Sequence, residues 1–497
     1  MPAKTFSTKL PIWLILYFII WVVAPFLLSA SYPLDVPEGI YWGREWQWGY
    51  YKHPPLSSWV LYSFYHVFGH IGPYLLSQCT IALSLWLAYL IGLQLMNRQR
   101  AFIGAQFLLA IFYYTWPSLE FNHNIAQMPI WLGLVYIFYK AIKYDRWQQW
   151  LAFGLLAGVG MLIKYTVVVL LASILIYSLL THYRSKWLSF KPWLAIFIAI
   201  AVFSPNLYWL VQHDWISLTY ASARSAEDAS RNGHFAALGY LATQLLNHLP
   251  ILIILLFTQT RLSYKQHSQT MRQNDWFFLL WMGLFPTIML VVVALVFAVG
   301  LRDMWGMPMW GLSGLIIAAM IPEQVLTPHK YNLLVRGISV WAITVTLLMI
   351  IYISFGARIR HKPSRMDWPQ AALAKQADEQ WQSLSSCQLD SVTGSDWPIL
   401  LVASYSKFAP SVMISGNADY SPWMSKHRLH QNGTMVLWLK GEQPNIPWIN
   451  HLAEDKKLMH FQGEWSIRWN KMPKRESLKV VWQAYVPNHC LKKSRPY

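Results

Sequence analysis

The sequence has little charge and few cysteines, and each shortage excludes classes of protein. Charged side chains make up 12% of its 497 residues, whereas soluble domains carry about 25%. Because 55% of the residues are hydrophobic, disorder, a fibrous repeat and a typical cytosolic enzyme are excluded. Three cysteines are too few for a disulfide scaffold. The composition indicates a polytopic membrane protein, and 29 Trp and 27 Tyr suit membrane–water interfaces.

Several sequence motifs are also missing. The chain has no G-x-x-x-x-G-K-[ST] phosphate loop, so it shows no ATPase of its own. It has no H-E-x-x-H and no G-x-S-x-G motif. No acid falls at the centre of an expected span, where an ion pump usually needs one. No internal repeat of the transporter kind is found.

The apolar runs predict about eleven transmembrane helices, since a spanning helix needs about 20 apolar residues. Along the loops between them, 15 basic residues fall on one side and 6 on the other. The positive-inside rule places the first set in the cytoplasm, together with the N-terminus. An odd number of spans then places the C-terminal tail in the periplasm of a bacterial inner membrane. The net charge of +18 does not indicate a nucleic-acid partner, because much of the basic charge flanks the membrane. The runs are 11–30, 74–96, 102–116, 125–142, 150–163, 165–181, 193–211, 238–259, 276–299, 309–321 and 337–356.

Charge is concentrated after residue 356. Residues 357–497 hold 30 of the 62 Asp, Glu, Lys and Arg residues, and residues 1–356 hold the rest. This contrast predicts a transmembrane domain, 1–356, followed by a soluble periplasmic α/β domain, 357–497. In the tail, 371–384 has the pattern of an amphipathic helix, and the apolar runs 398–403 and 434–438 have that of strands.

Cysteine positions leave two alternatives open for the tail. Cys387 and Cys490 lie near its two ends. If the tail is periplasmic, these two residues can pair in an oxidising compartment. The alternative is two unpaired thiols.

The first outer loop, residues 31–73, holds the densest cluster of unusual residues. A carboxylate there can act as a general base on a hydroxyl. Cations can neutralise a lipid-linked phosphate, and aromatic faces suit apolar substrate surface. A structural alternative is that Asp35 caps an interfacial helix, with Glu38 completing a capping box. His53 is a metal ligand, a hydrogen-bond donor or a plain structural residue. The cluster consists of Asp35, Glu38, Arg44, Tyr50, Tyr51, Lys52 and His53.

Three further outer regions carry polar residues whose roles stay open. Four polar residues precede or begin the fourth span, namely Glu120, Asn122, His123 and Asn124. They bind sugar hydroxyls or merely cap that helix. Lys164 lies where two apolar runs meet, so it snorkels to the interface or contacts phosphate. Arg302 holds phosphate or pairs with its neighbour Asp303.

Residues 212–237 form another outer region, long and mixed in charge. The sequence predicts an exposed loop here. The alternative is a loop that closes over substrate.

Five motifs in the right order, of which the first joins 34–38 to 48–56, carry a resemblance to a known superfamily. They cover nearly the whole chain: 34–38 (LDVPE), 48–56 (WGYYKHPPL), 121–124 (FNHN), 154–165 (GLLAGVGMLIKY), 205–209 (PNLYW), and in the tail the stretches 410–412, 421–423 and 433–438. These motifs resemble the membrane glycosyltransferases of the C superfamily. They are most similar to the family 39 and family 83 group, which includes protein O-mannosyltransferases and the aminoarabinose transferase of lipid A.

The resemblance implies an enzyme that moves a hexosyl or pentosyl group from a polyprenyl phosphate to an acceptor at the periplasmic face, with inversion at the anomeric carbon. Envelope glycolipids such as lipid A, or a secreted polymer, are the expected acceptors. Asp35 matches the catalytic base, and Glu38 is a second acid of that loop. We expect contacts with the donor phosphate from Lys52, Arg44, Lys164 and Arg302. We expect other substrate contacts from His53, Tyr50, Tyr51, Glu120, Asn122 and Asn124.

One departure from the superfamily pattern concerns Lys52. Many members carry an acid at this position, and the aminoarabinose transferase has Glu-Lys where this chain has Lys52-His53. A divalent metal is therefore left open as a cofactor. Two rival functions remain, a lipid or polysaccharide transporter and a non-catalytic envelope assembly protein.

Overall fold

The chain forms two compact units in a computed structural model that describes residues 12–265, 271–442, 446 and 448–492. The first unit takes in residues up to Ala24, then Lys52–Ser57 and Ile71–Met349. The second takes in Pro25–Tyr51, Ser58–His70 and the chain from Ile350 onward. The first outer loop therefore contributes to both units, and the chain passes from one to the other between Tyr51 and Lys52.

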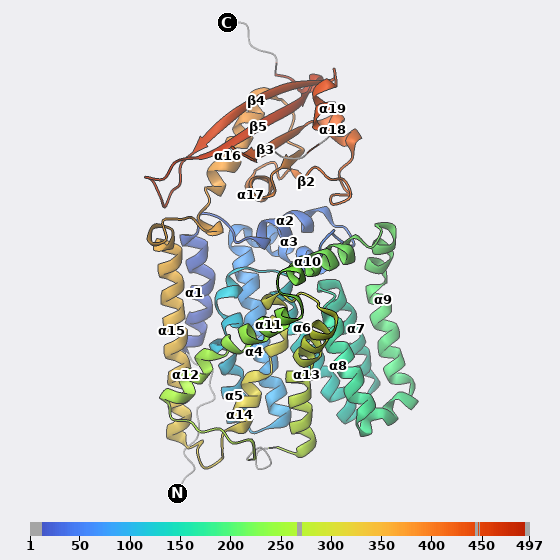
Figure 1. The fold of residues 1–497 in the computed structure, drawn as a ribbon, viewed down its shortest axis with the longest axis vertical. Coiled ribbons are helices and arrows are strands. Elements are labelled where there is room, and N and C mark those ends of the chain that lie inside the picture. Colours follow the sequence, from blue (N-terminus) through green and yellow to red (C-terminus); the bar gives the residue numbers. More distant parts are fainter. Residues whose placement is uncertain (1–11, 266–270, 443–445, 447, 493–497) are drawn as a thin grey trace. The chain divides into compact units, whose positions relative to one another are not determined.

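Helices make up almost all of the first unit (Figure 1). Between them run short 3₁₀ turns, of which η4 (Trp116–Leu119) and η8 (Asp303–Trp310) lie near predicted site residues. In chain order the helices that lie in this unit, wholly or in part, are α1 (Ile12–Leu28), α4 (Gly72–Leu95), α5 (Arg98–Phe107), α6 (His123–Tyr144), α7 (Trp147–Ile163), α8 (Val167–Leu180), α9 (Phe190–Gln212), α10 (Ile216–Asn232), α11 (Ala236–Leu246), α12 (Leu249–Phe257), α13 (Gln273–Phe297), α14 (Ser313–Met320) and α15 (Pro328–Ile359).

Six helical stretches in the described residues are long and apolar enough to cross a membrane, or up to eight if each of two bent pairs is one span. Two shorter apolar helices, α1 and α7, come in addition. The fold is thus that of a multi-pass membrane protein, and the count of eleven spans stays a prediction.

Two stretches differ from their predicted form. The run 102–116 is not one straight helix, because α5 ends at Phe107 and the chain bends by 86° into 3₁₀ turns. Residues 212–237 are not an exposed loop, because they contain α10. The alternation of charged and apolar residues in α10 gives the helix an amphipathic face. The prediction of a loop considered the mixed charge of this region and not its periodicity.

Glycines allow a close helix contact in the first unit, between α7 and α9. A Cβ on Gly154 would lie 2.3 Å from the carbonyl oxygen of Ala195, and one on Gly158 would lie 2.8 Å from that of Ala199. Small residues allow helix backbones to approach closely, which is a main source of packing energy within a membrane. The G-x-x-x-G pair of the sequence is therefore accounted for by helix packing.

The second unit joins helices of the first outer loop to an α/β domain. Helix α2 (Asp35–Glu45) lies beside α17 (Asp396–Tyr405) (Figure 1). The five-stranded sheet has the order β2-β1-β3-β5-β4, with parallel pairing of β1 to β2 and β3 and antiparallel pairing of β5 to β3 and β4. The remaining elements are α3 (Leu56–Phe68), α16 (Gln370–Leu384), β1 (Ser391–Gly394), β2 (Ser411–Ile414), α18 (Lys426–Asn432), β3 (Thr434–Leu439), α19 (Ile449–Glu454), β4 (Leu458–Ile467) and β5 (Leu478–Pro487).

The predicted tail elements are confirmed in two places out of three. Helix α16 matches 371–384, and strand β3 matches 434–438. The strand predicted over 398–403 is wrong, since this segment lies in α17. Every residue from Trp397 to Ser404 is buried, and a short, continuously apolar run does not distinguish a buried helix from a buried strand.

A disulfide between Cys387 and Cys490 closes the second unit near its two ends. The two cysteines are 103 residues apart in sequence, so the bond restricts almost the whole α/β domain in its unfolded state. Of the two alternatives left open by the sequence, the structure has the paired one.

We expect Cys490→Ser to lower the free energy of unfolding of this unit by as much as about 4–5 kcal/mol, the chain-entropy value for a loop of this length. Thermal unfolding of the full chain, followed by tryptophan fluorescence, measures the change. Trp381 is a local reporter, because it is fully buried and donates to the carbonyl oxygen of Cys387.

The matched control is Cys79→Ser, which changes an exposed cysteine in α4 that forms no disulfide. An equal loss of stability in both variants would contradict a stabilising role for the bond.

Candidate functional site

Asp35 and Glu38 lie on the first turn of α2, in the second unit. Asp35 is the first residue of the helix, and the preceding residue, Leu34, makes no side-chain cap. The alternative role of Asp35 as an N-cap, with Glu38 in a capping box, is therefore wrong. Asp35 is half-buried and Glu38 is buried.

The environment of these acids is apolar and aromatic. Tyr41, one turn after Glu38, is fully buried. Burial raises the pKa of Tyr41 well above its usual value, and the nearby charge of Glu38 raises it further. A carboxylate in such surroundings interacts more strongly with neighbouring charges than it would in water.

Arg44 anchors α2 to the α/β domain. Its guanidinium donates to the carbonyl oxygens of Ala409 at 2.6 Å, Pro410 at 3.1 Å and Ala403 at 3.0 Å. A planar fork of donors suits three acceptors at once. These bonds give Arg44 a structural role, and its predicted contact with phosphate stays a prediction.

Glu45, which the sequence did not single out, follows Arg44 in the same helix. Burial raises its pKa, while a hydrogen bond with Ser411 and the charges of Arg428 and Arg44 counteract this rise. Arg428 in turn donates to both oxygens of Asp390, at 2.8 and 3.0 Å. No sequence signal points to Glu45, since its neighbours come from strands and helices more than 300 residues away.

The two tyrosines of the loop lie in an aromatic layer of the second unit. Tyr50 stacks on Trp42, with ring centroids 5.1 Å apart, and its hydroxyl donates to the Trp42 carbonyl oxygen. Tyr51 stacks on Tyr420 of the α/β domain at 4.4 Å. Both tyrosines are buried, so in this structure they hold the loop in place.

A second group of predicted site residues lies in the first unit. The imidazole rings of His53 and His123 are 3.9 Å apart between centroids. Lys164 is buried and donates to the side-chain oxygen of Asn124, which is also buried. Snorkelling of Lys164 to the interface is therefore wrong, because protein surrounds the side chain. We call Lys52, His53, His123 and Lys164 the cationic cluster.

Electrostatics connect the members of this cluster. The pKa of His53 lies well below its usual range, because burial disfavours the charged imidazole and because His123, Lys164 and Lys52 each act in the same direction. His53 is thus a neutral imidazole near pH 7. Lys52 also lies over the ring of Tyr220 in α10, 5.7 Å from its centroid.

The polar residues near the cationic cluster differ in role: some support the local structure, and others are predicted to contact substrate. Asn122 accepts hydrogen bonds from the backbone N–H groups of Asn124 and Ile125, so it caps α6. Capping was one of the two roles that the sequence left open for it. This cap orients the turn that presents Asn124 to Lys164. Glu120 follows η4 and Arg302 precedes η8, and the roles of both stay predictions.

Among the residues that the structure describes, one group of three potential ligands lies close enough together to hold a metal ion. Cys387, His489 and Cys490 bring three ligand atoms within 4.8 Å of one another. Both sulfur atoms belong to the disulfide, so this group lacks the thiolates that a zinc site needs. The imidazoles of His53 and His123 form a pair only, and a metal role for them is left open.

Comparisons with known proteins agree with this picture. The family model of dolichyl-phosphate-mannose-protein mannosyltransferases matches residues 52–209. The lipopolysaccharide core galacturonosyltransferase RgtB of Rhizobium johnstonii is 25% identical over 454 residues, which cover 87% of each chain. The fold is similar to that of ArnT from Cupriavidus metallidurans bound to undecaprenyl phosphate, with a TM-score of 0.61, 14% identity, and coverage of 97% of this chain and 99% of that one. The apo form of the same protein gives a TM-score of 0.58.

These findings confirm the resemblance that the sequence motifs carry: the chain is similar to membrane glycosyltransferases of the C superfamily. The likeness to ArnT extends over almost the whole of both chains and establishes the fold.

The low pKa of His53 predicts how stability depends on pH. Above about pH 6.5 His53 is neutral in both the folded and the unfolded chain, so it contributes no difference. Below that value the unfolded chain takes up a proton that the folded chain does not, and stability falls as the pH falls. We expect the ligand-free protein to lose thermal stability as the pH falls from about 6.5 to about 5.5, and His53→Gln to lose less.

The control for this series is His182→Gln, which changes an exposed histidine between α8 and α9. Equal pH dependence of the melting temperature in the His53→Gln, His182→Gln and unaltered chains would contradict the assignment.

Proposed function

We propose that this chain transfers a sugar from a polyprenyl-phosphate donor to a lipopolysaccharide-type glycolipid at the periplasmic face of the inner membrane. The cationic cluster is the observation that carries this proposal. It gathers two lysines and two imidazoles from three separate parts of the sequence. The comparisons support the class of reaction, and the donor, the acceptor and the roles of the residues are proposed.

The electrostatics of the cluster favour an anion. Each charge acting on His53 lowers the pKa of its imidazole, which means that positive charge accumulates at this point. A bound phosphate lowers the electrostatic free energy of such a group, and the low dielectric strengthens the effect. Lysine acts on phosphate as a point charge, and neutral imidazole N–H groups add hydrogen bonds.

Relatives support the chemical nature of both substrates. The structure of ArnT from Cupriavidus metallidurans was determined with undecaprenyl phosphate, a polyprenyl phosphate of the proposed class. RgtB of Rhizobium johnstonii is named for the transfer of galacturonic acid to the lipopolysaccharide core. We infer that the present chain uses the same two classes of molecule.

The reaction proceeds by displacement at the anomeric carbon. Asp35 accepts the proton of an acceptor hydroxyl, and the hydroxyl oxygen attacks the anomeric carbon. The bond between this carbon and the phosphate oxygen breaks, and its electron pair remains on the polyprenyl phosphate. Lys52 and Lys164 stabilise the negative charge that develops on the leaving group. Glu38 is a second acid near the base, and the configuration at the anomeric carbon is inverted.

The disulfide supports the proposed orientation. Such bonds persist in oxidising compartments, and the bacterial periplasm is one of them. Because Cys387 and Cys490 lie in the α/β domain, we place that domain in the periplasm and the N-terminus in the cytoplasm. The excess of basic residues on the cytoplasmic loops agrees with this placement.

Asp35→Asn tests the catalytic base. Removal of a general base typically lowers the rate about 10²–10⁴-fold. We expect a deletion strain complemented with this variant to lack a sugar-sized mass on its envelope glycolipids, whereas complementation with the unaltered gene restores it. Mass spectrometry of the extracted glycolipids, at matched membrane levels of protein, provides the readout and names the sugar.

Asp214→Asn is the matched control, since Asp214 is an exposed acid of the region before α10. Full restoration by Asp35→Asn would refute the base assignment. An unchanged glycolipid profile in the deletion strain would refute the proposed acceptor.

Lys52→Gln and Lys164→Gln test the phosphate assignment. We expect each to weaken the binding of undecaprenyl phosphate about tenfold, which is the effect of losing about 1.4 kcal/mol from one charge-assisted contact. Asp35→Asn should bind the lipid with nearly unchanged affinity, because its role is in the transfer step. Binding of labelled lipid to purified protein in detergent measures the difference.

Lys140→Gln serves as the control, because Lys140 lies on α6 over the ring of Tyr136 and outside the cluster. Equal affinities for all the variants would rule out the cluster as the phosphate site.

A further inference from the structure

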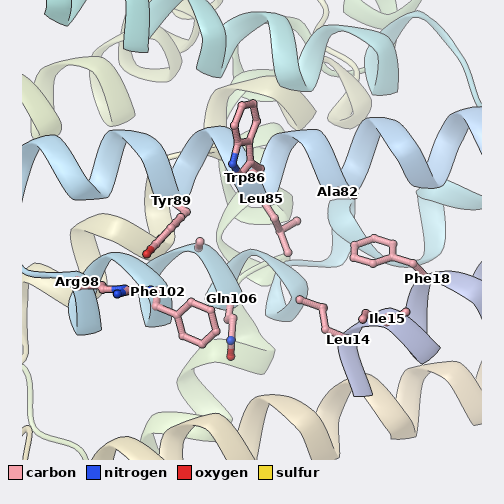
Figure 2. Close-up of a pocket in the computed structure, with 11 residues that line it drawn as sticks. Leu14, Ile15, Phe18, Ala82, Leu85, Trp86, Tyr89, Arg98, Phe102 and Gln106 are labelled. Carbon is pink, nitrogen blue, oxygen red and sulfur yellow. The ribbon is translucent and has the colours of Figure 1, made fainter. Parts of the chain in front are cut away.

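A groove in the first unit lies apart from every residue given a role above. It has a volume of about 420 Å³ and lies between α1, α4 and α5. Figure 2 shows Arg98 and Tyr89 at one end and the side chains of α1, among them Leu14 and Phe18, at the other. We call this space the α1–α4–α5 groove.

The walls of the groove are almost entirely apolar. Leu85 and Trp86 of α4 and Phe102 of α5 line its middle. The side chain of Trp86 is 56% exposed, so this part of the surface is open to a surrounding bilayer. A groove of this volume is large enough for a chain of methylene groups, and dispersion contacts favour filling it.

The polar end of the groove is positively charged. Arg98 is the first residue of α5, whose N-terminal N–H groups carry a partial positive charge. Its neighbour Arg100 is fully buried and satisfied by two carbonyl oxygens and by Glu323 at 2.8 Å. Arg98 is exposed, and no ion pair to it occurs among the described residues. Its charge is therefore available to an external anion.

Gln106 adds a polar point inside the apolar wall. It is 2% exposed, and neither its amide nitrogen nor its amide oxygen has a hydrogen-bond partner among the described residues. An unsatisfied buried amide costs about 1–3 kcal/mol. Gln106 lies eight positions after Arg98, which corresponds to about 12 Å along a helix. The two polar side chains therefore lie at different depths of the same groove.

We propose that the α1–α4–α5 groove binds an anionic phospholipid, with the phosphate at Arg98 and one acyl chain along Trp86, Phe102 and Phe18. A phospholipid combines in one molecule the anion and the apolar chain that the two ends of the groove require. Basic pockets between membrane helices on the cytoplasmic side suit anionic headgroups, and Arg98 belongs to the loops predicted to face the cytoplasm. The ester groups of the lipid are acceptors for an amide such as that of Gln106.

Native mass spectrometry of the full chain in detergent tests the proposal. The probes are phosphatidylglycerol and phosphatidylcholine with identical acyl chains. One arginine near a membrane surface contributes about 1 kcal/mol toward an anionic lipid, which is about a fivefold preference. We expect this preference in the unaltered protein and its loss in Arg98→Gln. Ala82→Phe, which places a ring in the groove, should reduce the retention of both lipids.

Arg184→Gln is the matched control, because Arg184 is an exposed arginine outside the groove, and it should keep the preference. Equal retention of the two lipids by the unaltered protein would overturn the proposal, as would an unchanged preference in Arg98→Gln.

Two competition arms identify the source of the anion. Displacement of the lipid by glycerol phosphate alone would show a headgroup site without an acyl chain and would overturn the proposal. Retention of undecaprenyl phosphate in place of phospholipid, with the same dependence on Arg98, would assign the groove to the donor lipid instead. These readouts measure binding and not sugar transfer, so they are independent of the proposed function.

Discussion

The buried charge of Lys164 must be stabilised by the protein groups that surround it in the first unit. An ammonium group among membrane helices is costly unless protein groups replace its water. Asn124 meets this condition by accepting a hydrogen bond from Lys164. Asn124 is in turn positioned by the Asn122 cap at the start of α6. The end of α7, the start of α6 and the His53 segment are thus brought together by the need to solvate a cation in a region of low dielectric.

The first outer loop meets a different constraint, because its residues belong to two units. Arg44 ties α2 to three carbonyl oxygens of the α/β domain, and Tyr51 stacks on Tyr420 of the same domain. The next residue, Lys52, belongs to the membrane-embedded unit. The α/β domain therefore supports the loop that carries the proposed base. This gives the tail a part in the proposed reaction, although it contributes none of the proposed catalytic side chains.

Sequence patterns predicted those features that depend on local chemistry. The amphipathic pattern of α16 and the apolar run of β3 both depend on near neighbours, and both predictions were confirmed. The strand predicted over 398–403 was wrong, because this segment lies in helix α17. Burial on all sides removes the hydrophobic periodicity that distinguishes a helix from a strand in the sequence. Glu45 was missed for a related reason, since the burial that raises its pKa, and the contacts with Ser411 and Arg428 that counteract this rise, arise only in the folded chain.

Charge alone leaves one part of the proposed reaction unexplained, namely the choice of sugar. Every polyprenyl-phosphate sugar presents the same phosphate, so a cationic cluster provides affinity without distinguishing one donor from another. Discrimination between sugars requires hydrogen bonds to individual hydroxyl or carboxyl groups, because a polar group left unpaired in the wrong complex is costly. Asn124 already accepts a hydrogen bond from Lys164, and Asn122 already caps α6. Glu120 follows η4, and its half-buried carboxylate is an acceptor suited to sugar hydroxyl groups. We therefore propose that groups around η4 select the sugar, whereas Lys52 and Lys164 recognise the phosphate that all these donors share.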